Sequence, residues 1–167
     1  MFIPGLQYRI LIYIAFGIVC EVLFTALYDL LKPGFLKSWN VFAHTPNPEK
    51  PQWRAHRDHR AMGYTFLWMI PIYALLFTLE PILPHILGWP WIIRGIFYAL
   101  GVWVVEYVGG FLIKLIIGKI PWDYTESDYH LHGLIRWDFF PYWFAFGLGA
   151  EKLILKAIAL SPHLINL

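Results

Sequence analysis

Long apolar segments set the pattern of hydrophobic and polar positions along the chain. Four segments reach about 20 residues, the length that an α-helix needs to cross the hydrocarbon core of a bilayer. They are residues 10–31, 64–83, 95–117 and 139–160. Strand-like alternation is absent, and unpaired backbone groups are too costly in lipid, so each segment is predicted to be a helix. Pro71 is expected to kink the second helix. The pattern therefore predicts an all-α integral membrane fold, in which residues 1–167 form one four-helix transmembrane bundle.

The composition indicates that a bilayer is the solvent of this chain. Hydrophobic residues make up 59% of it and charged residues only 14%, whereas soluble domains carry about 25% charged residues. The net charge is only +2 and no basic run is interleaved with aromatic residues, so nucleic acid is not an expected partner. No GxxxxGK(S/T), GxGxxG or GxSxG pattern occurs, so the sequence shows no nucleotide-binding motif. The single Cys20 excludes an intrachain disulfide framework.

Positive charge is unevenly distributed between the two sides of the predicted bundle. Nine of the 13 Lys and Arg residues lie in or beside the connectors 32–63 and 118–138, and four lie on the other side. The nine are Lys32, Lys37, Lys50, Arg54, Arg57, Arg60, Lys114, Lys119 and Arg136. The positive-inside rule therefore predicts that both connectors face the cytoplasm and that both termini face outward. The expected location is the cytoplasmic (inner) membrane, with the lipid bilayer as a direct partner.

Three carboxylates lie near the middle of predicted spans. Glu21, Glu106 and Glu151 belong to three different helices and are expected at a similar depth. An ionisable group at the bilayer centre costs roughly 2.5–3.5 kcal/mol, so all three are expected to point into the bundle. Asp29 follows Glu21 by two helical turns and shares its face. Three interpretations stay open: links between helices, a pathway for protons or cations, and a polar cavity for substrate or lipid.

The connector between the third and fourth spans is rich in polar and aromatic residues. Asp123 is placed to accept hydrogen bonds from the next backbone N–H groups in an Asx turn. Trp122 and Tyr124 are expected at the level of the lipid headgroups. Arg136 pairs either with Asp138, which requires an extended backbone, or with Asp123. The connector is therefore predicted to fold into an ordered polar cap over the cytoplasmic end of the bundle, which either is structural or controls access to the buried carboxylates.

Histidines of the two cytoplasmic connectors are the candidate metal ligands. His56 and His59 are three residues apart in HRDH, and His130 and His132 are two apart in HLH, a spacing that a strand places on one side. Imidazole with carboxylate suits Zn or non-haem Fe. The HxxHH clusters of membrane desaturases are absent, and the alternative interpretation is a solvated basic patch near anionic headgroups. The pattern does not predict a bound cofactor. The alternative is a Zn or Fe ion bound by these histidines.

Several segments, in order along the chain, resemble a known family. They are GIVCEVLFTALYDLL (17–31), GYTFLWMIPIYAL (63–75), RGIFYALGVWVVEYVGGFLIK (94–114) and WDYTESDYHLHGLIRWDFFPYWFAFGLGAE (122–151). Together they are similar to the transmembrane protein 229 family and its bacterial relatives, which are labelled type IV ABC-transporter permease-like membrane proteins. The most specific matches are Trp122, Asp123, Tyr124, Thr125, Gly133, Ile135, Tyr142, Trp143 and Glu151. The resemblance implies that Cys20, Glu21 and Glu106 also occupy family positions, and it carries no assigned activity.

These observations lead to three hypotheses for function. The first is a small multi-pass transport or permease-like component with a polar cavity lined by Glu21, Glu106 and Glu151. The second is a non-catalytic accessory subunit that stabilises a larger membrane protein complex through its aromatic outer surface. The third is a metal-dependent membrane enzyme that uses the histidines of the connectors. The sequence favours a protein that is not an enzyme, and it identifies no substrate.

Overall fold

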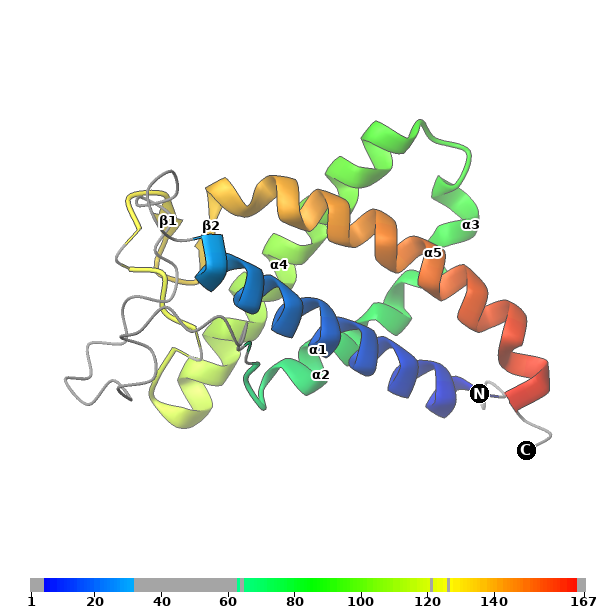
Figure 1. The fold of residues 1–167 in the computed structure, drawn as a ribbon, viewed down its shortest axis with the longest axis horizontal. Coiled ribbons are helices and arrows are strands. Elements are labelled where there is room, and N and C mark those ends of the chain that lie inside the picture. Colours follow the sequence, from blue (N-terminus) through cyan, green and yellow to red (C-terminus); the bar gives the residue numbers. More distant parts are fainter. Residues whose placement is uncertain (1–4, 32–62, 64, 121, 126, 165–167) are drawn as a thin grey trace.

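The computed structural model describes residues 5–31, 63, 65–120, 122–125 and 127–164. Helices account for most of these residues (Figure 1). The elements are α1 (Leu6–Leu31), α2 (Met69–Ala74), the 3₁₀ helix η2 (Leu75–Leu79), α3 (Leu83–Ile86), α4 (Trp91–Ile117), β1 (His130–Leu131), β2 (Ile135–Arg136), the 3₁₀ helix η3 (Trp137–Phe139) and α5 (Phe140–Leu164). The predicted helical fold class is confirmed at this level.

Two of the described helices are long and apolar enough to cross a membrane. They are the first 22 residues of α1, Leu6–Leu27, and the whole of α4. Pro90 precedes α4, and Gly118 ends it with a positive φ of 74° and an N–H that donates to Lys114 O. A glycine in this left-handed conformation is a common helix end because it has no Cβ to clash. The first and third predicted spans are therefore helices of spanning length.

The second predicted span is not one continuous α-helix. Residues 64–83 contain the short helix α2, which tightens into η2 and is followed by a turn before α3. Pro71, which was expected to kink a long helix, lies in the first turn of α2, where a missing backbone N–H costs nothing. Pro81 and Pro84 interrupt the helical hydrogen bonding further on. The structure thus has a broken helical segment where the hydrophobic pattern predicted one long helix.

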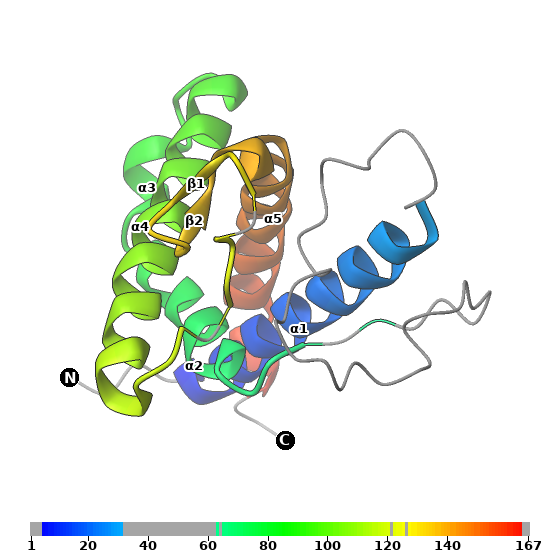
Figure 2. The ribbon, with the colours of Figure 1, turned by 90° about the vertical axis from the view of Figure 1, so that its left-hand side faces the viewer.

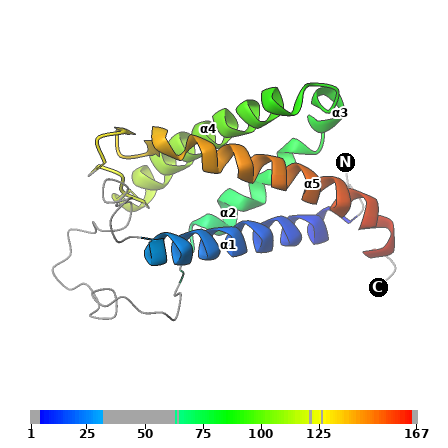
Figure 3. The ribbon, with the colours of Figure 1, turned by 45° about the horizontal axis from the view of Figure 1, so that its top comes forward.

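Helix α5 lies between α1 and α4, and α2 packs against α1 (Figure 2). Helices α1 and α5 run side by side in opposite directions, and the start of α1 lies at the same end of the molecule as the end of α5 (Figure 3). The contact between α4 and α5 is close because Gly147 of α5 faces Tyr98, where an added Cβ would overlap the Tyr98 Cβ. Glycine at this position lets the two backbones approach, as is common between helices in membranes.

The outer faces of α1 and α4 are apolar along most of their length. On α1 the exposed positions recur every four residues at Leu11, Val19, Leu23 and Leu27, with Ala15 completing the row. On α4 the exposed aliphatic residues are Ile92, Ile93, Ile96, Leu100, Val104, Val108, Leu112, Leu115, Ile116 and Ile117. The interior, in contrast, contains buried charged side chains. This inverted distribution suits lipid or apolar partner helices around the molecule.

Candidate functional site

Glu106 is a buried carboxyl group on α4 with very little hydrogen bonding. Its residue is only 4% exposed. The Tyr124 hydroxyl donates to Oε1 over a long 3.4 Å, and the buried Oε2 has no hydrogen-bond partner among the described residues. The indole N–H of Trp103, one turn earlier on α4, is also buried and has no partner in this described part of the chain. Burial of a polar atom without a partner costs about 1–3 kcal/mol, so this site is a local exception that needs an explanation.

Glu21 of α1 lies close to Glu106 but is better supported by hydrogen bonds. Its Oε2 accepts hydrogen bonds from the Thr65 hydroxyl at 2.5 Å and from the Tyr73 hydroxyl at 3.2 Å. The Tyr73 ring packs over Gly17, one turn before Glu21 on α1, where a larger residue would collide with the ring. The two carboxyl groups are near enough to interact electrostatically. Among the described residues neither of them forms an ion pair. We call Glu21 and Glu106 the cap-end pair.

Glu151 lies in a different cluster, although the sequence predicted it beside the other two carboxylates. Its residue is fully buried at 0% exposure. Arg94 Nε donates to Oε2 at 2.7 Å, the Tyr98 hydroxyl donates to the same oxygen at 2.6 Å, and Lys152 Nζ lies 3.6 Å from Oε1. Tyr98 precedes Glu106 by eight residues of α4, so the two sites are about 12 Å apart along the helix axis. The structure therefore brings Glu21 and Glu106 together and separates Glu151 from them.

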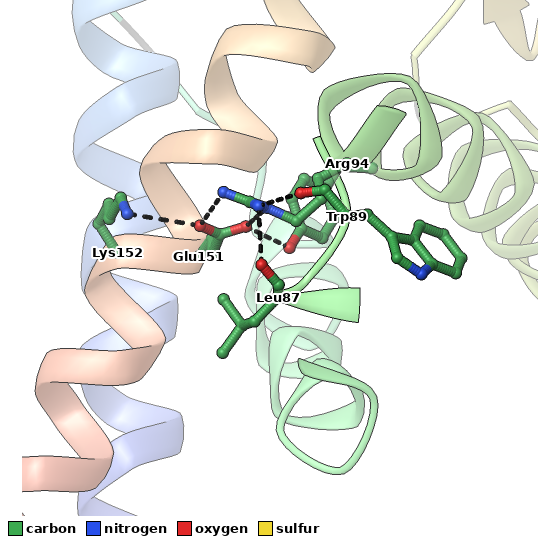
Figure 4. Close-up of polar contacts among 6 residues, drawn as sticks. Leu87, Trp89, Arg94, Glu151 and Lys152 are labelled. Atoms are coloured by element: carbon green, nitrogen blue, oxygen red, sulfur yellow. Dashed lines mark hydrogen bonds and ion pairs between the residues drawn. The ribbon is translucent and has the colours of Figure 1, made fainter. Parts of the chain in front are cut away.

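Arg94 links this cluster to the connection between α3 and α4. Its Nη1 donates to Leu87 O at 3.0 Å and to Trp89 O at 2.5 Å (Figure 4). Figure 4 shows Arg94 lying between these carbonyls and Glu151, while Lys152 approaches the carboxylate from the other side. We call Arg94, Tyr98 and Glu151 the arginine cluster. Its charge is balanced and its geometry ties the start of α4 to the middle of α5, which is a structural role.

A second buried ion pair was missed by the sequence analysis. Arg9 of α1 donates from Nε and Nη2 to the two carboxylate oxygens of Glu80, at 2.8 and 3.0 Å. The Tyr13 hydroxyl donates to Glu80 at 2.7 Å, and Arg9 also donates to the Ser161 hydroxyl of α5. This cluster joins α1, the residue that follows η2, and α5. Arg9 is one of the four basic residues that the positive-inside rule places on the outward side, and that rule gives no sign of a role inside the bundle.

The cap is a small folded hairpin between α4 and α5. Strands β1 and β2 are antiparallel, with His130 opposite Arg136 and Leu131 opposite Ile135. His132 and Gly133 have positive φ values of 54° and 71°, and Leu134 N donates to Leu131 O at 3.0 Å, which is typical of a type I′ turn. The hairpin lies at the end of the bundle opposite the start of α1 and the end of α5 (Figure 1).

Two polar contacts anticipated from the sequence are present in the cap. Asp123 Oδ1 accepts a hydrogen bond from Thr125 N at 2.9 Å, as an Asx turn requires. Of the two alternatives for Arg136, the structure shows the pair with Asp138, at 2.6 and 2.7 Å. Arg136 has the extended backbone that this pair needs, with φ −133° and ψ 119°. Its guanidinium is only 1% exposed and stacks over the Phe139 ring at 4.7 Å. The Arg136–Asp138 pair thus fixes the join between cap and α5.

Trp122 and Tyr124 hold the cap against α4. Trp122 is buried, and its indole N–H donates to Leu134 O at 2.9 Å. Both residues of this contact lie over Gly110, where a Cβ would meet Leu134 Cδ2 at 2.8 Å. Tyr124 N donates to Gly133 O at 3.1 Å, and its hydroxyl reaches Glu106. Burial and the nearby Glu106 carboxyl raise the pKa of the Tyr124 phenol well above its usual value, so it stays a donor toward Glu106.

The histidines of the cap do not converge on a common point. His130 Nδ1 accepts a hydrogen bond from Gly133 N at 2.9 Å, whereas His132 Nδ1 lies 2.9 Å from the Tyr107 hydroxyl. His132 sits in the turn and not in the strand, so the expected arrangement with both imidazoles on one side does not occur. Among the residues that the structure describes, no group of three or more His, Cys, Asp or Glu could hold a metal ion. His56, His59 and the side chain of Asp29 lie outside the described part.

The fold and the clusters define a mostly helical protein with two candidate membrane-spanning helices and ionisable groups in its interior. Residues 51–166 match the family model described as "Putative ABC-transporter type IV". This match covers more than half of the chain, and the chain belongs to that family. The family name indicates an ABC-transporter-related membrane protein. No solved structure matches the chain.

Proposed function

We propose that the chain is a small permease-like component of a membrane transport system, and that the cap-end pair is the polar site through which a cation passes. The observation that carries this proposal is the charge imbalance at Glu21 and Glu106. Glu80, Asp138 and Glu151 each face an arginine. In the described residues the cap-end pair has hydroxyl partners only. Intramembrane ionisable groups without a structural counter-ion are typical of ion pathways.

The family membership supports a transport context for this site. The proposal includes the predicted membrane arrangement: four spans in the inner membrane, with the cap on the cytoplasmic side and both termini outside. It also retains the likeness to the transmembrane protein 229 family. The proposal assigns no ATP binding to these residues. Coupling to ATP, where it is used, is assigned to a separate nucleotide-binding subunit.

Flux through reconstituted protein tests this proposal. Purified chain in liposomes is expected to pass H⁺, Na⁺ or K⁺ under an imposed potential, as measured with enclosed ion-sensitive dyes. Glu106→Gln, which keeps the side-chain shape and removes the ionisable carboxyl group, is expected to lose most of that flux. The matched control is Asp128→Asn, which neutralises an exposed acid of the cap. Equal flux through wild type and Glu106→Gln would refute the proposal.

A second candidate function rests on the exposed apolar faces of α1 and α4. An accessory subunit would pack these faces against the helices of a larger membrane protein complex. Gly101 on the exposed face of α4 has no atom near its missing Cβ, which leaves room for a partner helix. Purification from native membranes in mild detergent distinguishes the two functions. Recovery in fixed ratio with a larger complex, together with no flux from the isolated chain, would favour the accessory role.

A further inference from the structure

The two carboxyl groups of the cap-end pair have different surroundings. Glu21 accepts two hydroxyl hydrogen bonds on one oxygen, from Thr65 and Tyr73. Within the described residues, Glu106 has one long contact on Oε1, from Tyr124, and its buried Oε2 has no hydrogen-bond partner. Hydrogen bonds donated to a carboxylate favour its ionised form, whereas burial without donors favours the neutral acid. The geometry therefore assigns the negative charge to Glu21 and the neutral form to Glu106.

No free positive charge reaches Glu106 from the described elements around it. Helix α1 contributes Glu21, α2 contributes Tyr73, and the cap contributes Tyr124. The cation of the cap, Arg136, acts on Tyr124 and is already held by Asp138 in a two-point ion pair.

Helix α5 presents aromatic rings on this side. Phe146 lies 6.1 Å from the Tyr73 ring, and Trp143 lies 6.0 Å from Phe146, measured between ring centroids. Aromatic walls of this kind lower the local dielectric constant, so two adjacent carboxylates cannot both be ionised at low cost.

We propose that Glu106 is a proton-binding site, with Glu21 as the ionised partner that holds the proton there by its charge. Hydronium transfers H⁺ to the Glu106 carboxylate, an O–H bond forms, and water is left; release reverses the step. A proton fits better than a metal ion because the described residues offer only two carboxylates here, with hydroxyl groups as the remaining partners. The inference deepens the proposed function by naming the cation, and it rests on that function only for passage across the membrane.

Infrared spectroscopy of the full chain in detergent tests this site directly. A protonated carboxyl group has a C=O stretch that is distinct from that of a carboxylate and shifts in D₂O. The wild type is expected to show such a band at neutral pH. The band is expected to remain in Asp128→Asn and to disappear in Glu106→Gln. Glu106→Asp keeps an acid at the site and is expected to retain a shifted band, so a folding defect in the Gln variant does not leave the question open.

Three results would overturn the proton site. The first is the absence of an acid band from wild type at neutral pH. The second is a band that survives in Glu106→Gln. The third is loss of the band when Na⁺ or K⁺ is added at constant pH, which would identify an inorganic cation as the occupant. If the band behaves as expected while liposomes show no flux of any cation, the proton site stands and the transport function fails.

Discussion

The arginine cluster and the cap-end pair place buried carboxyl groups at two levels of the same bundle. The two sites differ in the side chains that surround these carboxyl groups. Glu151 is fully buried and faces Arg94, Tyr98 and the more distant Lys152. Glu106 is almost as buried and has one long hydrogen bond. Burial alone therefore does not distinguish a structural carboxylate from a functional one. The distinction lies in whether the surrounding side chains balance the charge.

The other described ion pairs resemble the arginine cluster. Arg9–Glu80 and Arg136–Asp138 are both bidentate. The first pair connects α1 to the end of η2, and the second connects the cap to the start of α5. Bidentate arginine–carboxylate pairs add geometric specificity as well as energy. These pairs fix the ends of the bundle, whereas no ion pair among the described residues includes Glu21 or Glu106.

The largest expected effect comes from breaking the arginine cluster. Arg94→Leu leaves the Glu151 carboxylate buried without its main cation, and removal of one partner of a buried pair costs about 3–5 kcal/mol. We expect the free energy of unfolding in detergent to fall by that amount, measured by denaturant titration. Lys152→Ala is the control, because Lys152 is 70% exposed and lies 3.6 Å from Glu151. It should change stability by less than about 0.5 kcal/mol. If Arg94→Leu lowers the free energy of unfolding by less than about 1 kcal/mol, the Arg94–Glu151 pair is as weak as a surface ion pair. The arginine cluster would then not differ in stability from the cap-end pair.

A smaller effect is expected from a change in packing behind the same cluster. Gly147→Ala places a Cβ against the Cβ of Tyr98, whose hydroxyl donates to Glu151. Overpacking costs about 1–3 kcal/mol and outweighs the gain of up to about 1 kcal/mol in helix propensity. We expect a net loss of about 1–2 kcal/mol in a thermal or denaturant melt. Gly149→Ala is matched on the same helix, since its Cβ would meet only Phe16 Cζ at an ordinary 3.7 Å. It should be neutral or stabilising, and the same sign for both variants would contradict the close approach of α4 and α5.

The positions of most helices could be predicted from the sequence, because the apolar pattern sets their length. The predicted spans 10–31 and 95–117 end at the same residues as α1 and α4, and the predicted span 139–160 lies almost wholly within α5. The region 64–83 differed because its prolines mattered more than its hydrophobicity. Pro81 lies after η2 within this region and Pro84 lies just beyond it, where a continuous helix would need their missing N–H groups.

The candidate site could be predicted only in part. The Asp123 turn involves residues two positions apart, so local geometry was enough to predict it. For Arg136 the sequence left two partners open, Asp138 and Asp123, and only the structure distinguishes them. The Arg94–Glu151 contact joins residues 57 positions apart. Sequence indicates how deep a residue lies along a helix but not which neighbouring helix it faces. A carboxylate in mid-helix often pairs with a cation, so Glu151 was the available signal for Arg94.

The smallest stability change is expected at Glu106, and its measurement distinguishes the cap-end pair from the arginine cluster most directly. Glu106→Gln replaces a carboxyl group that has no counter-ion among the described residues, so little stabilisation is lost, and we expect the free energy of unfolding to stay within about 0.5 kcal/mol of wild type. Glu151→Gln, the matched change in the arginine cluster, removes hydrogen bonds between charged groups and should cost about 1.5–3 kcal/mol. Both are measured by the same denaturant titration in detergent. Equal losses would mean that Glu106 is also a structural carboxylate whose partner lies outside the described residues, and the functional assignment of the cap-end pair would then fail. A neutral Glu106→Gln beside a destabilised Glu151→Gln would show that charge balance, and not burial, separates the two sites.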